Sequence, residues 1–381
     1  MGARAPRARV RRRAPGRHWG VRLSSTVGDL RDAVRVAQRA VPNVPARPEF
    51  AGLLVVAGAA SASVIGSRNE ETTVAATATA TALEPGRVLL PASALAAYLA
   101  TFDAPTAVEL VHDGGPTATV RAGQGAPYHL RVIDATLRLP DPPAAEPLTV
   151  DFTRLGAALA SVRATLDPDT GAVQVVSGPD GLALHSTDMH RLSRCVVPEA
   201  GFGDHRIVLP YEALDWVAKL AVTTVTLDPA SPAVRFAGPG AVVSTRLLAT
   251  PFPDVAPLLR QTPPHRTRLS ASALSTALAR LRALSPQASV TVEIAEEAVV
   301  VRMNSEDVGW GEERLDARGT VGPPTLFYVR AGYLADAITA LAPADDVVEV
   351  RWSDSLAAVH LVASGPLATT VLVMPQRPPA T

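Results

Sequence analysis

A short apolar strand that runs into an amphipathic helix occurs three times in this sequence, and the repeat constrains the fold more than any other feature. The three copies begin at Val88, Ile207 and Phe327, at spacings of 119 and then 120 residues. A second landmark of small and polar residues lies about 20 residues before each copy, at 66–70, 185–188 and 302–306. Self-similarity at a fixed period is typical of repeated structural units, so the chain is expected to contain three units of one topology.

Each unit also opens with a predicted helix and continues into strands. Apolar side chains recur at helical spacing in three stripes: Leu30, Val34, Ala37 and Val41; Leu155, Leu159, Val162 and Leu166; Leu274, Leu278 and Leu281, which follow a predicted N-cap at Ser270. Runs rich in β-branched residues predict strands at 53–57, 108–111, 173–176, 222–227, 290–294 and 347–352. Alternation at Val290, Val292 and Ile294 indicates antiparallel strands with one covered face.

The predicted fold class is therefore α+β, with three repeated domains that each place two helices on an antiparallel sheet. Proline-rich stretches at 139–147 and 262–265 fall where the repeats should join. These positions predict a basic extension at 1–20 and domains at 21–145, 146–264 and 265–381.

Composition excludes several classes of protein. The 36 basic and 36 acidic residues balance, but eight arginines lie in the first 22 residues, so the remainder carries 28 basic against 36 acidic side chains. A uniformly basic nucleic-acid coat is excluded, and any DNA contact must come from local patches. The single cysteine, Cys195, excludes a disulfide scaffold and a cysteine-rich zinc site. No apolar run approaches the roughly 18 residues of a membrane span, which predicts a soluble, cytoplasmic protein without a membrane partner.

The arginine-rich N-terminus has two interpretations. It contains Arg, Ala, Pro and Gly without hydrophobic periodicity, and no apolar segment of the kind found in a secretory signal follows it. Such an arm could bind the phosphate backbone of nucleic acid. The alternative is a disordered extension without function.

Several motifs lie in the same order as in a known family. Residues 186–192 read Ser-Thr-Asp-Met-His-Arg-Leu, residues 251–254 read Pro-Phe-Pro-Asp, and residues 374–377 read Met-Pro-Gln-Arg. Residues 46–48, Ala-Arg-Pro, precede the first predicted strand of the first unit. Together these segments resemble the bacterial sliding clamp, the beta subunit of DNA polymerase III, over roughly residues 20–377. Three motifs in order on a threefold repeat make the resemblance fairly specific.

The resemblance implies a non-catalytic processivity factor that needs no cofactor or metal. Such a protein forms a homodimeric, head-to-tail ring of three-domain protomers around double-stranded DNA, which it holds without reading its sequence. The DNA polymerase III alpha subunit, the clamp loader and other clamp-motif proteins would dock short peptides between the second and third domains. Matched positions give the expected peptide-binding residues Thr187, His190, Arg191, Leu192, Pro253, Leu258, Leu356, Met374, Pro375 and Arg377.

Sliding requires diffuse positive charge that faces phosphates. Arg31, Arg35 and Arg39 recur every four residues on the first predicted helix, away from its apolar stripe, and Arg47 lies in the Ala-Arg-Pro motif. These four are the expected DNA-binding residues. The alternative for the helix is an ordinary solvated face with i,i+4 ion pairs.

Some positions differ from the family pattern. Ser93 and Glu212 stand where a basic residue is usual, while Met189, Pro257 and Gln376 replace Gly, Arg and an apolar residue. The channel is therefore expected to be less positive than in a typical clamp. A diverged paralogue that binds partner peptides or is insensitive to an antibiotic, with weak DNA function, is the alternative function.

An enzyme is the alternative from another class. His185, Asp188 and His190 could form a metal or acid–base cluster. In an extended strand, however, residues 188 and 190 would point one way and residue 185 the other, so only two of the three would converge. No glycine-rich phosphate loop or nucleophile motif accompanies them, and catalysis is not expected.

Overall fold

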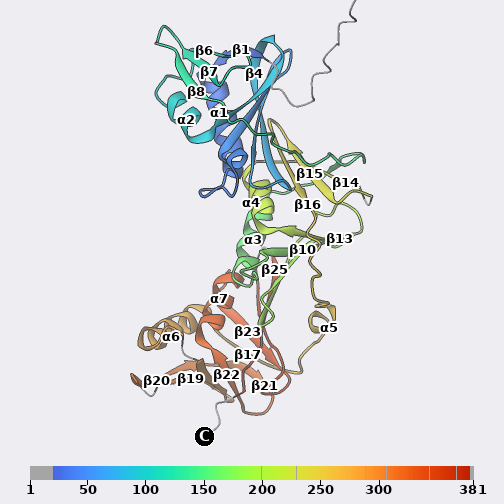
Figure 1. The fold of residues 1–381 in the computed structure, drawn as a ribbon. Helices are drawn as coiled ribbons and strands as arrows, with labels where there is room; N and C mark the ends of the chain where they lie inside the picture. Colours follow the sequence, from blue (N-terminus) through green and yellow to red (C-terminus); the bar gives the residue numbers. More distant parts are fainter. Residues whose placement is uncertain are drawn as a thin grey trace, which may run out of the picture. The chain divides into compact units, whose positions relative to one another are not determined.

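The computed structural model describes residues 20–377, apart from positions 199, 229, 288, 306, 343 and 366. The described chain divides into two compact units (Figure 1). The first contains the described residues up to Pro142 together with Pro239–Ser244, and the second contains Pro143–Gly238 and the described residues from Thr245 onward. Apart from Gly20, the predicted basic extension lies outside the described residues. None of the helices in the described part is long and apolar enough to cross a membrane.

The first unit is built on one antiparallel sheet. Its strands are β1 (Val21–Thr26), β2 (Gly52–Ala57), β3 (Ser61–Ser67), β4 (Thr72–Glu84), β5 (Gly86–Pro91), β6 (Ala107–His112), β7 (Thr117–Ala122) and β8 (Tyr128–Arg131). They pair in the order β8-β7-β6-β1-β4-β3-β2-β5. The helices α1 (Val27–Ala37) and α2 (Ala92–Leu99) pack against each other, and α1 also covers β3 and β4.

Helix α1 shows how the sequence pattern becomes packing. The Thr26 hydroxyl caps its first turn by accepting a hydrogen bond from the Asp29 amide at 3.1 Å, which satisfies one otherwise unpaired donor. Leu30, Val34 and Ala37 are buried, as the apolar stripe predicts. The α-helix ends at Ala37, and a 3₁₀ turn, η1 (Gln38–Ala40), leads to Val41, which still packs against the core. A second 3₁₀ turn, η2 (Pro48–Ala51), precedes β2.

The second unit contains a large antiparallel sheet and two smaller ones. The strands are β9 (Leu148–Thr149), β10 (Ala172–Gly178), β11 (Gly181–Thr187), β12 (Arg191–Val197), β13 (His205–Pro210), β14 (Thr224–Leu227), β15 (Ala233–Gly238), β17 (His265–Ser270), β18 (Ser289–Ile294), β19 (Ala298–Ser305), β20 (Gly309–Asp316), β21 (Arg318–Val321), β22 (Thr325–Arg330), β23 (Val347–Trp352), β24 (Val359–Ala363) and β25 (Ala368–Val373). The boundary between the units falls within β16 (Ala241–Arg246).

The large sheet has the order β13-β10-β11-β12-β25-β24-β23-β17-β21, and a four-stranded sheet has the order β20-β19-β18-β22. Strand β14 pairs with β9 on one side and β15 on the other. The helices of the unit are α3 (Leu155–Arg163), α4 (Tyr211–Lys219), α5 (Ala256–Leu259), α6 (Ala271–Leu284) and α7 (Ala331–Leu341). The pairing of β12 with β25 joins residues 191–196 to the end of the chain within one sheet.

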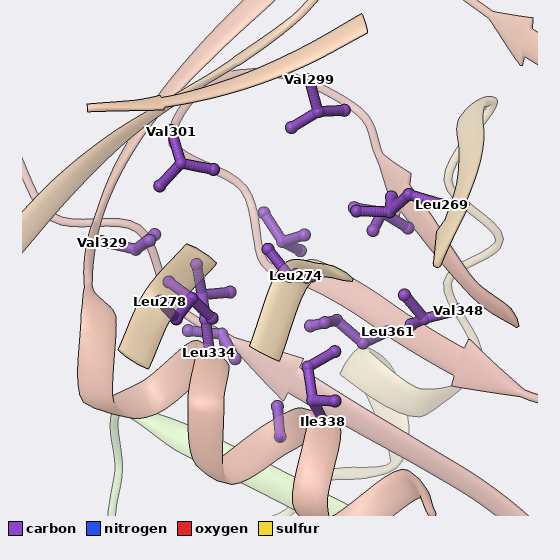
Figure 2. Packing of buried hydrophobic residues seen from close by; sticks show 14 of the residues in the cluster. Leu269, Leu274, Leu278, Val299, Val301, Val329, Leu334, Ile338, Val348 and Leu361 are labelled. Atoms are coloured by element: carbon purple, nitrogen blue, oxygen red, sulfur yellow. The ribbon is translucent and has the colours of Figure 1, made fainter. Parts of the chain in front are cut away.

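Helices α6 and α7 lie side by side and cover strands from both sheets (Figure 1). The Ser270 hydroxyl accepts a hydrogen bond from the Ala273 amide at 3.0 Å, which confirms the predicted N-cap. Leu274 and Leu278 of α6 meet Leu334 of α7 over Val301 of β19 in a continuous apolar core (Figure 2). Each fully buried leucine contributes about 1.5–3 kcal/mol relative to an exposed one, so this core anchors the C-terminal part of the unit.

The structure confirms the sequence repeat element by element. The three strand–helix landmarks are β5 into α2, β13 into α4 and β22 into α7, and in each the helix starts at the residue after the strand. The second landmark is the end of an equivalent strand in each copy: β3, β11 and β19. The predicted strands are also present, although β14 begins at Thr224 rather than Val222. Helices on antiparallel sheets confirm the α+β class, while the division into three domains stays a prediction.

Candidate functional site

The motif at 186–192 forms the tight turn between β11 and β12. Met189 occupies the left-handed region with φ of 70°, the backbone conformation that favours the glycine usual at this position in the family. The Thr187 hydroxyl accepts from the Met189 amide at 3.0 Å and donates to the Arg191 carbonyl at 2.6 Å. The Asp188 carboxylate accepts from the amides of His190 and Arg191 at 3.0 and 2.7 Å. The expectation of an extended strand through 188 and 190 is therefore wrong, because these residues form a hydrogen-bonded turn.

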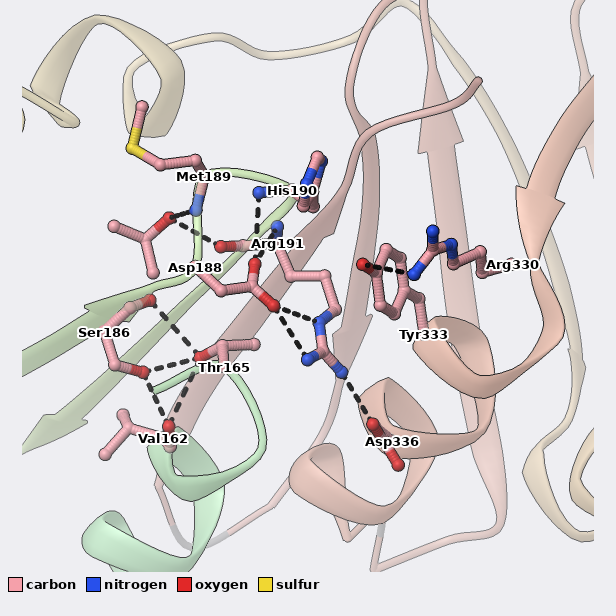
Figure 3. A network of polar contacts seen from close by, with 11 residues as sticks. Val162, Thr165, Ser186, Asp188, Met189, His190, Arg191, Arg330, Tyr333 and Asp336 are labelled. Atoms are coloured by element: carbon pink, nitrogen blue, oxygen red, sulfur yellow. Dashed lines mark hydrogen bonds and ion pairs between the residues drawn. The ribbon is translucent and has the colours of Figure 1, made fainter. Parts of the chain in front are cut away.

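Arg191 ties this turn to helix α7 (Figure 3). Its Nε and Nη2 donate to Asp188 Oδ2 at 3.0 and 2.8 Å, and its Nη1 donates to Asp336 Oδ2 at 2.6 Å. The guanidinium carbon lies 4.2 Å from the centre of the Tyr333 ring, which is a cation–π distance. The side chain is only 11% exposed, so Arg191 is fixed by charge, hydrogen bonds and packing together. Its main role is to hold the wall of the site in place.

Tyr333 contacts two residues of this wall, His190 and Arg191, although no motif in the sequence pointed to it. Its ring stacks on the imidazole of His190, with centroids 6.1 Å apart. On its other flank, Arg330 Nη1 donates to the Tyr333 hydroxyl at 3.4 Å (Figure 3). A lone tyrosine on a predicted helix carries no local signal, because its position beside His190 depends on how α7 packs against the sheet.

Beside the turn lies a groove of about 210 Å³. Seven of the ten predicted peptide-binding residues line it, and they come from three separate segments: Thr187, His190, Arg191, Leu192, Pro253, Leu258 and Met374. Met189, Asp254, Val255 and Leu372 complete the lining. Leu192, Val255 and Leu372 are buried, whereas Met189 is 71% and Met374 37% exposed. The groove therefore has an apolar floor and flexible methionines at its rim, which suits apolar side chains of more than one shape.

The strand pairing explains why the C-terminal motif meets the 186–192 motif. Leu192 of β12 lies directly opposite Leu372 of β25 in the antiparallel register. One residue after β25, the Met374 amide donates to the His190 carbonyl at 2.9 Å. The segment that follows β16 closes the third side, since Val255 and Leu258 pack in the same apolar cluster as Leu192 and Leu372. Strand pairing thus joins two of the three segments, and apolar packing adds the third.

The other three predicted residues lie outside the groove lining. Leu356 is 52% exposed in the turn between β23 and β24, two residues before Ala358, which belongs to the cluster beneath the groove. Pro375 and Arg377 follow Met374 along the tail and do not line the groove. The intervening Gln376 attaches the tail to the four-stranded sheet: its amide donates to the Tyr328 carbonyl at 2.6 Å, and its side-chain oxygen accepts from Ser289 at 2.8 Å.

The predicted DNA-binding arginines differ in their exposure and in the groups that they contact. Arg35 is exposed on α1 and pairs with Asp32 at 2.8 Å, and Arg39 is exposed in η1. Arg31 is partly buried and donates to the Phe102 carbonyl at 3.1 Å. Arg47 faces two carboxylates, Glu70 at 2.5 Å and Glu49 at 3.7 Å. The hydrogen bond that Arg47 donates to Glu70 raises the pKa of Arg47 above its usual value, and the charge of Arg47 is largely compensated within the first unit.

The proposed catalytic cluster does not form. Within the described residues, no group of three or more His, Cys, Asp or Glu side chains could hold a metal ion. His185 is buried in β11, where its Nδ1 lies 3.1 Å from Gln174 Oε1, while Asp188 and His190 belong to the turn. Burial, followed by the nearby charges of Arg194 and Arg206, lowers the pKa of His185 to about 4.

Known proteins resemble this chain in sequence and in fold. No protein-family model matches the chain. A curated relative, the beta sliding clamp of Synechococcus elongatus, is 24% identical over 376 residues, which cover 93% of this chain and 99% of the relative.

Solved structures of sliding clamps share the fold of this chain. The DNA polymerase sliding clamp of Caulobacter crescentus matches with a TM-score of 0.84 at 19% identity, and that of Pseudomonas aeruginosa with 0.83 at 16% identity. The beta subunit of DNA polymerase of Streptococcus pyogenes matches with 0.81 at 20% identity. Each match covers 94% of this chain and 100% of the solved one. The chain therefore has the fold of the bacterial sliding clamps and is similar in sequence to a beta sliding clamp over nearly its whole length, as its motifs predicted.

Proposed function

We propose that this protein is a DNA sliding clamp, a non-catalytic processivity factor that encircles duplex DNA and tethers a DNA polymerase. The observation that carries the proposal is the groove in which motifs from residues 187–192, 253–258 and 374 meet on a clamp fold. Full-length similarity to a curated beta sliding clamp supports this function over that of a paralogue with weak DNA function.

The groove receives short peptides of partner proteins. Its floor of Leu192, Val255 and Leu372 is apolar and suits the leucine or phenylalanine anchors of a docking peptide. Above the floor, the imidazole of His190 and the Met374 side chain provide one polar and one adaptable contact. The partners are the polymerase alpha subunit, the clamp loader and other proteins with a Gln-x-x-Leu-x-Phe-like motif.

The ring forms by pairing of two copies. Strand β8 ends the sheet of the first unit and β20 ends the four-stranded sheet, so each has an open edge in the described chain. Both edges carry exposed aromatic side chains, Tyr128 at 57% and Trp310 at 75%, and Leu284 of α6 is 41% exposed. Open edges with apolar side chains favour strand pairing with another chain. In a head-to-tail dimer, the β8 edge of each copy would meet the β20 edge of the other copy, so that all four edges would be covered.

Retention on DNA is topological rather than based on affinity. Outside the first 22 residues the acids outnumber the bases by eight, so there is no net attraction to a polyanion. Arg35 and Arg39, with Arg31 nearby, provide a few phosphate contacts from α1 and η1. So few contacts imply a shallow salt dependence, because each contributes a slope of roughly −0.9 in log K against log salt on duplex DNA.

The test compares nicked circular with linear DNA in the presence of a clamp loader, for the full chain and for residues 23–381. Retention on circles that is lost on linearisation is the expected result for both proteins. Equal retention on the two DNA forms, or a monomer in analytical ultracentrifugation, would contradict the ring. Tight binding to linear DNA that disappears with residues 1–22 would instead assign DNA binding to the basic arm.

A further inference from the structure

A second cavity, of about 290 Å³, opens on the large sheet and shares only Asp254 and Val255 with the lining of the groove. Three arginines line it: Arg194 of β12, Arg206 of β13 and Arg260, which follows α5. None of the three forms an ion pair with a residue that the structure describes. Asp254 is the one carboxylate among the described lining residues, so the lining carries a net positive charge.

The strand register builds this site on one face of the sheet. Gln174, His185 and Arg194 lie directly opposite one another on β10, β11 and β12. Arg206 of β13 lies opposite Val176, two residues from Gln174, and therefore projects from the same face. Helix α3 packs against β11 and β12. Its Ser161 lies near Cys195, which neighbours Arg194 in β12 and so projects from the opposite face.

One buried atom in this cavity lacks a partner. His185 is only 7% exposed, and its Nδ1 lies 3.1 Å from Gln174 Oε1. Because a carbonyl oxygen can only accept, Nδ1 carries the proton and Nε2 is left as an acceptor. Nε2 has no hydrogen-bond partner among the described residues. Buried polar atoms in native proteins are nearly always hydrogen-bonded, so Nε2 is available to accept a hydrogen bond from an occupant of the cavity.

We propose that this cavity binds inorganic phosphate. Its oxygens accept from the guanidinium groups of Arg194, Arg206 and Arg260, which match phosphate geometry well. Both ionised forms of inorganic phosphate near neutral pH retain a hydroxyl, which donates to His185 Nε2. A carboxylate and the dianion of a phosphomonoester have no proton to donate at this pH, so they satisfy the arginines but leave Nε2 unpaired.

The test is a phosphate titration of the full chain by calorimetry, with the imidazole resonances of His185 followed by NMR. Inorganic phosphate is expected to bind saturably and shift the His185 resonances. Arg206→Gln should weaken binding at least tenfold, whereas Arg318→Gln, an exposed arginine on β21 away from the cavity, should leave it unchanged. Both arginines are exposed, so these variants are expected to fold.

Two further ligands complete the experiment. Phenyl phosphate, whose dianion has no hydroxyl, is expected to bind more weakly than inorganic phosphate, and tighter binding of phenyl phosphate would overturn the hydrogen bond to Nε2. Acetate that binds as tightly as phosphate would overturn the proposed ligand class. Phosphate binding that is equal in the wild type and in Arg206→Gln, or that leaves the His185 resonances unmoved, would overturn the site.

Discussion

Arg191 and Asp336 are 145 residues apart in the sequence, yet Arg191 Nη1 and Asp336 Oδ2 lie 2.6 Å apart. The contact attaches the turn between β11 and β12 to helix α7. Asp336 is 47% exposed, whereas Arg191 and its second partner Asp188 are 11% and 12% exposed. Water therefore weakens the contact with Asp336 far more than the contact with Asp188.

This difference gives a first prediction. Asp336→Asn should lower the free energy of unfolding by less than about 1 kcal/mol, since exposed ion pairs contribute little. Arg191→Ala should lower it by about 2–4 kcal/mol, because it leaves the carboxylate of Asp188 buried without a cation. Urea denaturation of both variants measures the two values. Equal losses would contradict the assigned roles.

The groove itself gives the second prediction. Met374→Ala should weaken binding of a fluorescent Gln-x-x-Leu-x-Phe peptide about tenfold, because it removes part of the apolar rim, and removal of residues 374–381 should weaken it further. Leu326→Ala on β22 is the control: Leu326 is 44% exposed and does not line the groove. Fluorescence anisotropy gives the affinities. Unchanged binding after the deletion would place the peptide site elsewhere.

The backbone conformation of Met189 gives the third prediction. Its φ of 70° costs a non-glycine residue about 1 kcal/mol. Met189→Gly should therefore raise the free energy of unfolding by about 0.5–1 kcal/mol, while Met189→Ala, which keeps the Cβ, should not. Thermal denaturation of the two variants distinguishes the outcomes, and a glycine variant no more stable than the alanine variant would refute the idea of strain.

His185 predicts a specific pH dependence of stability. Its pKa of about 4 in the folded protein lies below the ordinary value of 6.5, because burial and two arginines disfavour the charged ring. Above pH 6.5 the ring is neutral in both states. Between pH 6.5 and 4 the unfolded chain takes up a proton that the folded chain does not, so stability falls as pH falls, by about 1.4 kcal/mol per pH unit at most.

His185→Gln removes this titrating group and should flatten the stability curve in that range. Denaturant unfolding at several pH values, in buffers free of phosphate, measures the slope for both proteins. A slope that persists in the variant would assign the effect to other groups.

The dimer edges give the last prediction. Trp310→Arg places a charge on the open edge of β20 and should raise the dissociation constant of the dimer at least tenfold. Leu326→Ala, on the opposite edge of the same sheet, serves again as the control. Sedimentation velocity reports the dimer fraction. A Trp310→Arg protein that is as dimeric as the wild type would exclude this edge from the interface.

Local patterns in the sequence determined the elements and their repetition. The apolar stripes of α1 and α6, the cap at Ser270 and the three strand–helix landmarks depend on neighbouring residues and formed where predicted. The motif residues Thr187 to Leu192 were likewise recognisable, because their order resembles that of a known family, whereas the tight turn they form became evident only in the structure.

Tertiary structure alone decided which segments meet. Three contacts illustrate this: Leu192 pairs with Leu372, Tyr333 stacks on His190, and Arg47 forms an ion pair with Glu70. In each case the residues around one partner carry no signal that identifies the other partner. The register of a sheet is set by burial and pairing along its whole length. Whether a charged side chain contacts DNA or forms an ion pair depends on which neighbour the fold brings close to it. For this reason the sequence indicated the walls of the groove, whereas its floor at Leu372 and the arginine-lined cavity around His185 required the assembled sheet.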